Sequence, residues 1–226
     1  MALSAWALPR PADAQDDGPR WQEDPFTLGV ASGMPRADGM VLWTRLAPGG
    51  EDVQARDARP PCKVRWEIFE DEALRRRVTG GEQVTDAARA FGVHVQVAGL
   101  APQREYWYRF TCGDARSPVG RSRTGPAGGG PVGRVRLALA SCQHYEYGFY
   151  AAHREIAGRE LDAVVFVGDY IYEGHLSAAN AVRRHDAPVP QTLDEYRARH
   201  ALYKRDPDLQ AGHAAHPWVL TWDHHE

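Results

Sequence analysis

Residues that can bind metal ions or transfer protons are concentrated in the second half of the chain. Nine of the ten histidines lie after residue 140. The same region holds Cys142 after one run of small and apolar residues and Asp169 after another. A third apolar run is followed by Asp223, His224 and His225. Thiolate, carboxylate and imidazole groups are common ligands of transition metals, so the three clusters predict a metal centre.

The elements that carry these clusters follow a β-α-β pattern. They are strands at 134–141, 163–167 and 218–222 and helices at 149–160 and 193–215. The second strand is apolar throughout, which is typical of a strand buried on both faces in a parallel sheet. Ligands gather at the carboxyl ends of the strands in an open α/β sheet, so we expect the three clusters to meet at one edge.

Tyr172 narrows the choice of metal. A phenolate from Tyr172, together with the Cys142 thiolate and the Asp169 carboxylate, suits a hard, oxidised ion such as Fe(III). Asp169 ends the middle strand, so it is the carboxylate expected to touch two ions. Two metal ions about 3.5–4 Å apart can clamp a phosphoryl group. The composition of this cluster therefore points to phosphoryl chemistry.

Each of these residues also has an ordinary structural explanation. A thiol can be buried in a core, a carboxylate can cap a turn, a tyrosine can pack, and a pair of histidines can belong to a solvated loop. The occurrence of three clusters at three successive strand ends favours a metal site over these separate explanations. The histidines expected on helix surfaces, without a role in the site, are His153, His200 and His213.

Residues 25–124 predict a β-sandwich. Segments 63–69, 93–97 and 106–110 alternate between apolar and polar side chains with a period of two, as half-buried strands do. Tyr106 follows the Leu100-Ala101-Pro102 loop, and this spacing resembles the tyrosine corner of fibronectin type III domains. Residues 125–133 are rich in Gly and Pro and predict a linker to an α/β part at 134–226.

Composition excludes several classes of protein. The 226 residues include 27 Lys+Arg and 30 Asp+Glu, a net charge of −3, which excludes a polybasic nucleic-acid-binding surface. No apolar run approaches the roughly 18–20 residues that span a bilayer. Residues 1–24 predict a disordered lead-in or the remnant of an export signal. In an exported protein Cys62 and Cys112 could pair, which would leave Cys142 as the third cysteine.

Five segments together resemble the PhoD-type alkaline phosphatases of the calcineurin-like metallophosphoesterase superfamily. They are 26–33, 41–45, 140–143 (Ala-Ser-Cys-Gln), 168–173 (Gly-Asp-Tyr-Ile-Tyr-Glu) and 221–226 (Thr-Trp-Asp-His-His-Glu). The resemblance implies a fibronectin type III-like sandwich followed by an incomplete α/β metallophosphoesterase domain. It also implies hydrolysis of phosphate monoesters and diesters, and export by the twin-arginine route to the periplasm or the exterior.

The resemblance further implies a centre of Fe(III) and Ca(II). Cys142, Asp169 and Tyr172 would be iron ligands, with Asp169 bridging to calcium. Asp223 and His224 would be further metal ligands, and His225 would be the catalytic residue that protonates the leaving oxygen.

Two departures from the family pattern shape our expectations. The family has Trp-Asp-Asp-His-Glu where this chain has His224 in place of the second aspartate, and imidazole is a poor ligand for calcium. The superfamily also draws ligands, including an Asp-x-His element, from a C-terminal half that lies beyond Glu226. We therefore expect the 226-residue chain to be inactive or nearly so. The alternatives are a non-catalytic cell-surface binding module with a vestigial α/β half, and a structural zinc site.

Overall fold

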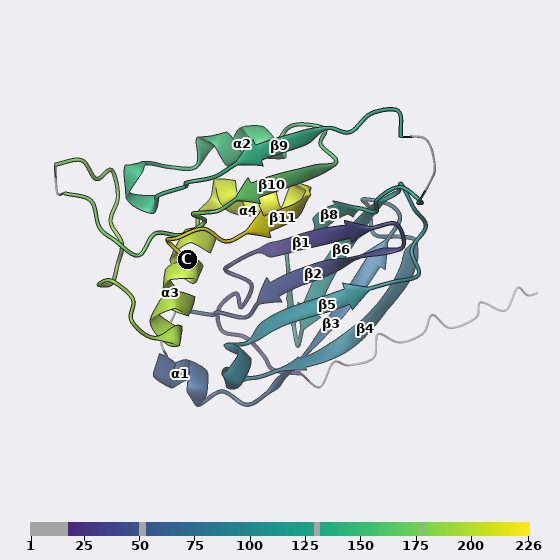
Figure 1. Ribbon diagram of the computed structural model, residues 1–226. Helices are drawn as coiled ribbons and strands as arrows, with labels where there is room; N and C mark the ends of the chain where they lie inside the picture. Colours follow the sequence, from purple (N-terminus) through teal and green to yellow (C-terminus); the bar gives the residue numbers. More distant parts are fainter. Residues whose placement is uncertain (1–17, 50–52, 129–131, 178) are drawn as a thin grey trace, which may run out of the picture.

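The strands of the protein form two sheets, which are described by a computed structural model for residues 18–49, 53–128, 132–177 and 179–226. A six-stranded sheet has the order β5-β2-β1-β11-β10-β9, and a five-stranded sheet has the order β4-β3-β6-β7 with β8 also paired to β6 (Figure 1). The strands are β1 (Val30–Arg36), β2 (Gly39–Arg45), β3 (Cys62–Phe69), β4 (Arg77–Thr85), β5 (Gly92–Val97), β6 (Glu105–Cys112), β7 (Ala115–Arg116), β8 (Gly120–Arg123), β9 (Leu137–Ala140), β10 (Ala163–Val167) and β11 (Pro217–Thr221). The helices are α1 (Val53–Asp57), α2 (Ala151–Ala157), α3 (Leu193–Lys204) and α4 (Pro207–Ala215), with 3-10 turns at Ala87–Arg89 and Tyr145–Tyr147.

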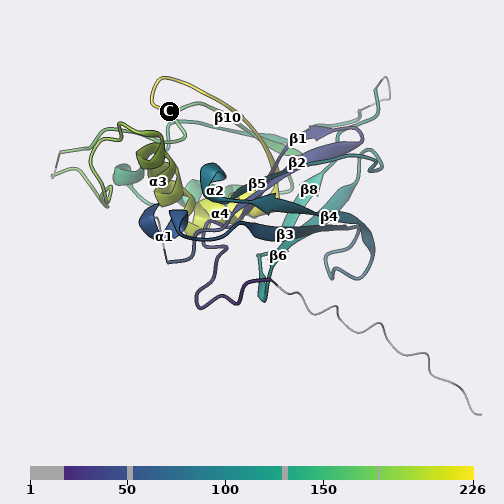
Figure 2. The ribbon, with the colours of Figure 1, turned by 90° about the horizontal axis from the view of Figure 1, so that it is seen from below.

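The N-terminal strands pack face to face around one apolar core. Met40 and Leu42 of β2 and Val95 of β5 meet Val64 of β3 and Tyr108 of β6 in this core. Figure 2 shows the strands of the two sheets as separate layers. The predicted strands at 63–69, 93–97 and 106–110 are confirmed, because their alternating side chains supply the buried positions.

One local prediction in this part was wrong, and one strand was missed. The apolar run at 26–30 predicts a strand, but it is mostly a turn. Strand β1 begins only at Val30, because the Gly29 N–H donates to the Phe26 carbonyl and turns the chain. Strand β4 was not predicted, since its sequence carries two glycines and few apolar residues. It pairs with β3 along nearly its whole length, so backbone pairing rather than side-chain burial defines it.

The loop before β6 is tied to the strand by a tyrosine, as the sequence predicted. The Tyr106 hydroxyl accepts the Ala101 N–H at 3.0 Å and donates to the Ala101 carbonyl at 3.4 Å. Nearby, Cys62 and Cys112 are buried on neighbouring strands and their side chains are hydrogen-bonded to each other. The disulfide considered for an exported protein stays a prediction.

The second half contains the predicted β-α-β unit. Strands β9, β10 and β11 are parallel neighbours, with β10 in the centre. Phe166 of β10 and Trp218 of β11 stack at 5.8 Å on the face that Leu209 of α4 and Tyr203 of α3 cover. Helix α4 begins where the sequence pattern is interrupted, because the Asp206 side chain accepts the first free N–H groups and Pro207 occupies the first turn.

Strand β11 joins the two halves of the chain. It pairs in parallel with β10 on one side and with β1 on the other, so one sheet runs through the whole protein. At this seam Gly33 lies opposite Trp218, and a Cβ on Gly33 would lie only 2.6 Å from the Trp218 carbonyl oxygen. The sequence predicted a sandwich at 25–124, a linker at 125–133 and an α/β part at 134–226, but it did not predict this shared sheet.

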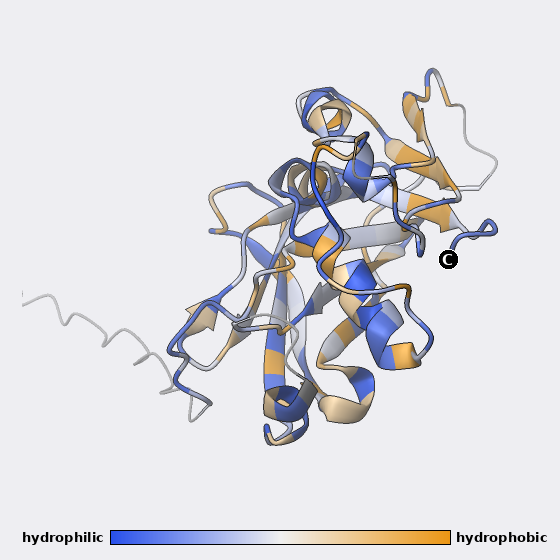
Figure 3. Cartoon of the chain, turned by 90° about the vertical axis from the view of Figure 1, so that its left-hand side faces the viewer, coloured by the Kyte–Doolittle hydropathy of each residue, from blue (hydrophilic) through white to orange (hydrophobic). Residues whose placement is uncertain are grey.

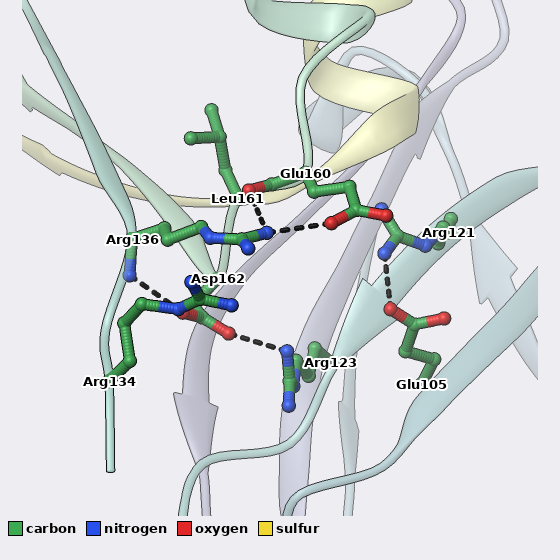
Figure 4. A pocket seen from close by; sticks show the side chains of 8 residues that line it. All are labelled: Glu105, Arg121, Arg123, Arg134, Arg136, Glu160, Leu161 and Asp162. Atoms are coloured by element: carbon green, nitrogen blue, oxygen red, sulfur yellow. Dashed lines mark hydrogen bonds and ion pairs between the residues drawn. The ribbon is translucent and has the colours of Figure 1, made fainter. Parts of the chain in front are cut away.

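Ion pairs reinforce the seam at the opposite end of the strands from the metal-ligating residues. Arg123 of β8 pairs with Asp162, just before β10, and Arg121 donates to the Ala215 carbonyl at the end of α4. These side chains lie in a polar pocket of about 370 Å³ (Figure 4). The residues that line it are Glu105, Arg121, Arg123, Arg134, Arg136, Glu160, Leu161 and Asp162. Each carboxylate in it already holds a guanidinium, so the pocket acts as an ion-pair network.

The other face of the parallel strands is apolar and open to water. Leu139 of β9 is 73% exposed, Val167 of β10 is 44% exposed and Val219 of β11 is 43% exposed. Figure 3 shows hydrophobic residues along these strands. Among the described residues, no helix is both long enough and apolar enough to cross a lipid bilayer.

Replacing Gly33 with Ala tests the seam. We expect the free energy of unfolding to fall by about 1–3 kcal/mol, because the new methyl group would collide with the backbone of β11. Urea unfolding followed by tryptophan fluorescence measures it. Gly158→Ala is the matched control, since the nearest atom to a Cβ there is 3.7 Å away. Equal stability of the two variants would contradict the pairing.

Candidate metal centre

The three clusters that the sequence singled out meet at one edge of the six-stranded sheet. Cys142 follows β9 by two residues, Asp169 follows β10 by two, and Asp223 follows β11 by two. Two backbone hydrogen bonds join the loop after β9 to the loop after β10. The Cys142 N–H donates to the Gly168 carbonyl, and the Gln143 N–H donates to the Asp169 carbonyl. Parallel strand order therefore brings these side chains together.

The backbone is strained at both ligand positions. Cys142 has φ of 58° and Asp169 has φ of 56°, and residues other than glycine rarely adopt this left-handed backbone conformation. Between β10 and Asp169, Gly168 has φ of 101°, and a Cβ there would lie 2.4 Å from the Cβ of Asp223. The glycine thus allows the third loop to approach the second. Strain of this kind is concentrated at functional sites because the surroundings must hold it.

Asp169 is a buried carboxylate with an oxygen that lacks a hydrogen bond. Its side chain accepts from the Tyr172 hydroxyl at 2.9 Å and from the Cys142 thiol at 3.6 Å, both through Oδ2. Oδ1 has no hydrogen-bond partner in the described part of the chain, and the residue is only 4% exposed. The exposed His224 ring places its Nδ1 3.8 Å from Oδ1. An orphaned buried carboxylate oxygen is costly, so this geometry fits a bound cation.

The donor set around Asp169 fits the predicted hard metal ion. Burial raises the pKa of Tyr172, and its hydrogen bonds to Asp169 and Cys142 raise that pKa further. The phenolate is disfavoured beside these groups only as long as no cation neutralises them. Thiolate, carboxylate and phenolate groups converge here, and a trivalent ion would favour the anionic form of all three.

The third cluster places two histidines beside this group. Metal-ligating atoms of Asp169, His224 and His225 all lie within 4.8 Å of one another. The ring centroid of His225 lies 4.2 Å from that of Tyr172, with the two ring planes tilted. The carboxylate of Asp223 lies outside this group and contacts His224 Nδ1 at 3.2 Å. This contact raises the pKa of His224, and the negative charge of Asp169 raises that pKa further.

Sequence reasoning did not give a role to Glu173. Its Oε2 lies 2.8 Å from His225 Nδ1, which makes a carboxylate–histidine pair next to Tyr172. Although burial acts to raise the pKa of Glu173, backbone hydrogen bonds and the contact with His225 lower it overall. Glu173 is therefore ionised at neutral pH. The signal was present in the 168–173 segment, but only the fold shows that residue 173 faces residue 225.

A second cluster of possible ligands surrounds Glu146. Glu146, His175 and His185 carry ligand atoms within 4.8 Å of one another. The Glu146 carboxylate is buried and already accepts the N–H groups of Leu176 and His185. Burial opposes ionisation, but these hydrogen bonds lower the pKa of Glu146 to about 2. The Arg199 guanidinium also lies 3.2 Å from His185 Nδ1, so this cluster is a hydrogen-bonded hub.

The sequence predicted His153, His200 and His213 on helix surfaces; this was wrong for His153 and His213, and His200 is half-buried. His153 and His213 are buried: His153 Nε2 lies 2.7 Å from Gln143 Oε1, and His213 stacks on Trp218 at 3.9 Å. Their helices turn these faces toward the sheet, and burial lowers the pKa of both rings. They are neutral core residues that support the loops from behind.

Comparison with known proteins places this arrangement in a family. The chain is 46% identical over 217 residues to "Alkaline phosphatase D" of Bacillus subtilis (strain 168), which covers 92% of this chain and 36% of the relative. A solved structure described as "Structure of PhoD" superimposes with a TM-score of 0.87 at 45% identity, covering 92% of this chain and 40% of that one. The chain thus spans well under half the length of both.

The family profiles match both halves of the chain. The profile "PhoD-like phosphatase, N-terminal domain" matches residues 12–126, which is about half of the chain, and the profile "PhoD-like phosphatase" matches residues 137–226. The second match contains all three strand-end clusters of the metal centre. The chain therefore belongs to the PhoD-like phosphatase family.

Proposed function

We propose that this protein hydrolyses phosphate monoesters and diesters with the help of bound metal ions. The observation that carries the proposal is the buried Asp169 carboxylate, which has an orphaned oxygen and lies among a thiol, a phenol and an imidazole. Identity with a curated alkaline phosphatase supports the same reaction class. The loss of activity expected for the 226-residue chain alone stays a prediction, which the assays below check when they are run on this chain.

Cys142, Asp169 and Tyr172 are the residues that would hold a ferric ion. Asp169 would also contact a second ion, for which Ca(II) is the candidate and Asp223 and His224 are the nearest further groups. The chemistry that such ions supply is positive charge, which stabilises the oxygens of a phosphoryl group during displacement. Since imidazole is a poor calcium ligand, the carboxylate of Asp223 is the better donor of the two.

His225 and Glu173 provide a proton donor for the leaving group. Glu173 accepts the Nδ1 proton of His225 and stabilises the charged imidazolium. The proton on Nε2 is then available to the leaving oxygen of the ester. A carboxylate that orients a histidine in this way keeps the imidazole in one tautomer and stabilises the protonated ring. The pair lies against the Tyr172 ring, next to the proposed ligands.

A non-catalytic binding module is the competing function, and no feature of the site favours it. Chelator-sensitive hydrolysis of an aryl phosphate monoester and a diester by the full-length form of the protein supports the enzyme. Binding of a ligand without turnover would support the module. We also propose export by the twin-arginine route and a fibronectin type III-like class for the sandwich. Both rest on the family resemblance, and the Tyr106 contact adds support for the sandwich class.

Replacing Asp169 with Asn in the full-length form of the protein is expected to lower metal content and turnover by about 100-fold or more, because the amide carries no charge to offset that of the ions. Elemental analysis and hydrolysis of an aryl phosphate measure the two effects. Asp162→Asn is the matched control, since Asp162 lies at the other end of β10 and pairs with Arg123. Retention of metal and turnover in the Asp169 variant would contradict the site.

Replacing Tyr172 with Phe is expected to remove a visible charge-transfer band from the iron-loaded protein, because the band requires a phenolate bound to Fe(III). Absorption spectroscopy on samples of known iron content measures it. Tyr147→Phe serves as the control, since Tyr147 is exposed and lies near the site without contacting Asp169 in the described structure. A colourless wild-type protein with stoichiometric iron would exclude Tyr172 as a ligand.

Replacing Glu173 with Gln is expected to lower kcat by about 10–100-fold, the usual cost of losing a group that orients an active-site histidine. Because the two residues act as a unit, the Glu173→Gln, His225→Ala double variant should be no slower than His225→Ala alone. Steady-state kinetics of the four proteins measure the coupling. Glu155→Gln, on the exposed surface of α2, is the control. If the losses of kcat in the two single variants add up in the double variant, Glu173 does not act through His225.

A further inference from the structure

Helix α3 holds the backbone of Tyr172 from both sides. The Tyr203 hydroxyl accepts the Tyr172 N–H at 3.0 Å. The Arg199 guanidinium donates to the Tyr172 carbonyl at 2.7 Å and to the Glu173 carbonyl at 2.9 Å. We propose that Arg199 and Tyr203 are positioning residues that set the geometry of the metal centre through these contacts. The inference rests on the proposed function, in which Tyr172 is a ligand and Glu173 orients His225.

The two residues are rigidly placed. They lie four positions apart and so share one face of the helix. Arg199 is 2% exposed and Tyr203 is fully buried. The helix itself begins with a capping box in which Thr192 and Glu195 bond to each other's backbone N–H groups. A side chain on such a helix moves less than one on a loop, so it can serve as a fixed reference for the loop it holds.

Arg199 binds the loop as a buried cation surrounded by carbonyl oxygens. In addition to the Tyr172 and Glu173 carbonyls it donates to the carbonyls of Ala187 and Pro188 at 3.0 and 2.9 Å. A buried guanidinium is tolerated only when its donors are paired, so loss of any of these bonds is costly. The planar fork with five donors fits four carbonyls at once, which a lysine ammonium cannot reproduce.

Tyr203 joins the two loops that carry the proposed ligands. Its hydroxyl also accepts the N–H of Tyr145 at 3.1 Å, and Tyr145 lies in the loop that follows Cys142. The His185 ring is a third neighbour of this hydroxyl, with Nε2 3.1 Å from the oxygen. His185 Nδ1 lies 3.2 Å from the Arg199 guanidinium and 3.6 Å from the Glu146 carboxylate. His185 therefore connects both positioning residues to the buried hub around Glu146.

This arrangement predicts that the ligand loops are held in place before any metal binds. One hydroxyl group spans the loop after β9 and the loop after β10, so it limits how far Cys142 and Tyr172 can separate. Arg199 adds the same restraint to Glu173 and hence to His225. Preorganised ligands bind an ion without a further ordering cost.

The first experiment measures the restraint itself, without metal or activity. The 226-residue chain is labelled with 15N-tyrosine, and the amide of Tyr172 is assigned by its loss in Tyr172→Phe. In metal-free Tyr203→Phe, which keeps the ring and removes only the hydroxyl, the amides of Tyr172 and Tyr145 should exchange with deuterium at least about tenfold faster. Tyr196→Phe, on the same helix, is the control and should leave both rates unchanged. Unchanged rates in Tyr203→Phe would overturn the inference.

The second experiment measures the metal centre in the iron-loaded protein. Arg199→Lys should shift or broaden the charge-transfer band and speed iron release by at least about tenfold. Arg197→Lys, at a half-buried arginine of α3 that contacts Asp194 and the Ala88 carbonyl, should do neither. Arg199→Lys also covers the case in which Tyr203→Phe fails to fold. A wild-type protein with no band would refute the iron assignment, while the amide rates would still decide the restraint. A normal band in Arg199→Lys, with unchanged iron release, would overturn the positioning role.

Discussion

The parallel pairing of β11 with both β1 and β10 is the interaction on which the architecture depends. It makes one sheet of strands from the two ends of the described chain, since Gly33 pairs with Trp218. The same strand carries the Asp223–His225 cluster to the edge where Cys142 and Asp169 lie. The seam needs a glycine on β1 and a glycine after β10, because Gly33 and Gly168 both lie where a side chain would collide with the β11 segment. Stability and site assembly therefore share one set of contacts.

The site at that edge is electrostatically incomplete by itself. A thiol, a carboxyl group and a phenol share one hydrogen-bonded cluster, and Oδ1 of Asp169 has no hydrogen-bond partner among the described residues. The positive φ angles of Cys142 and Asp169 add backbone strain at the same point. A bound cation would offset the electrostatic cost of this cluster. This balance supports the metal-dependent hydrolysis that we propose.

Behind the site lies a second layer that has no free capacity for ligands. Glu146 is saturated by backbone N–H groups, Arg199 by carbonyl oxygens, and Tyr203 by two N–H groups and a histidine. The opposite end of the sheet is similar, where each carboxylate of the polar pocket is paired with an arginine. Among the buried side-chain atoms of the described residues that lack a hydrogen-bond partner, Asp169 Oδ1 is the carboxylate oxygen, in contrast to these satisfied networks.

Local sequence patterns determined much of this protein. The apolar run ending at Asp169 predicted β10 with its observed bounds, the alternation at 63–69 predicted β3, and the interruption at Asp206-Pro207 marked the start of α4. The residue types at three strand ends also predicted which side chains gather at the candidate metal centre. These features depend on neighbours within a few residues, and periodicity and capping report such neighbours directly.

Only the tertiary structure decided which distant residues meet. Three contacts join segments that no local pattern relates. They are the pairing of β1 with β11, the contact of Glu173 with His225 and the hydrogen bond from Arg199 to the Tyr172 carbonyl. Strand β4 was missed because it forms by backbone pairing with β3 and has few buried side chains. The buried helix histidines were misplaced because their helices turn that face toward the sheet. Sequence periodicity specifies that a segment has a face, but packing decides what that face contacts.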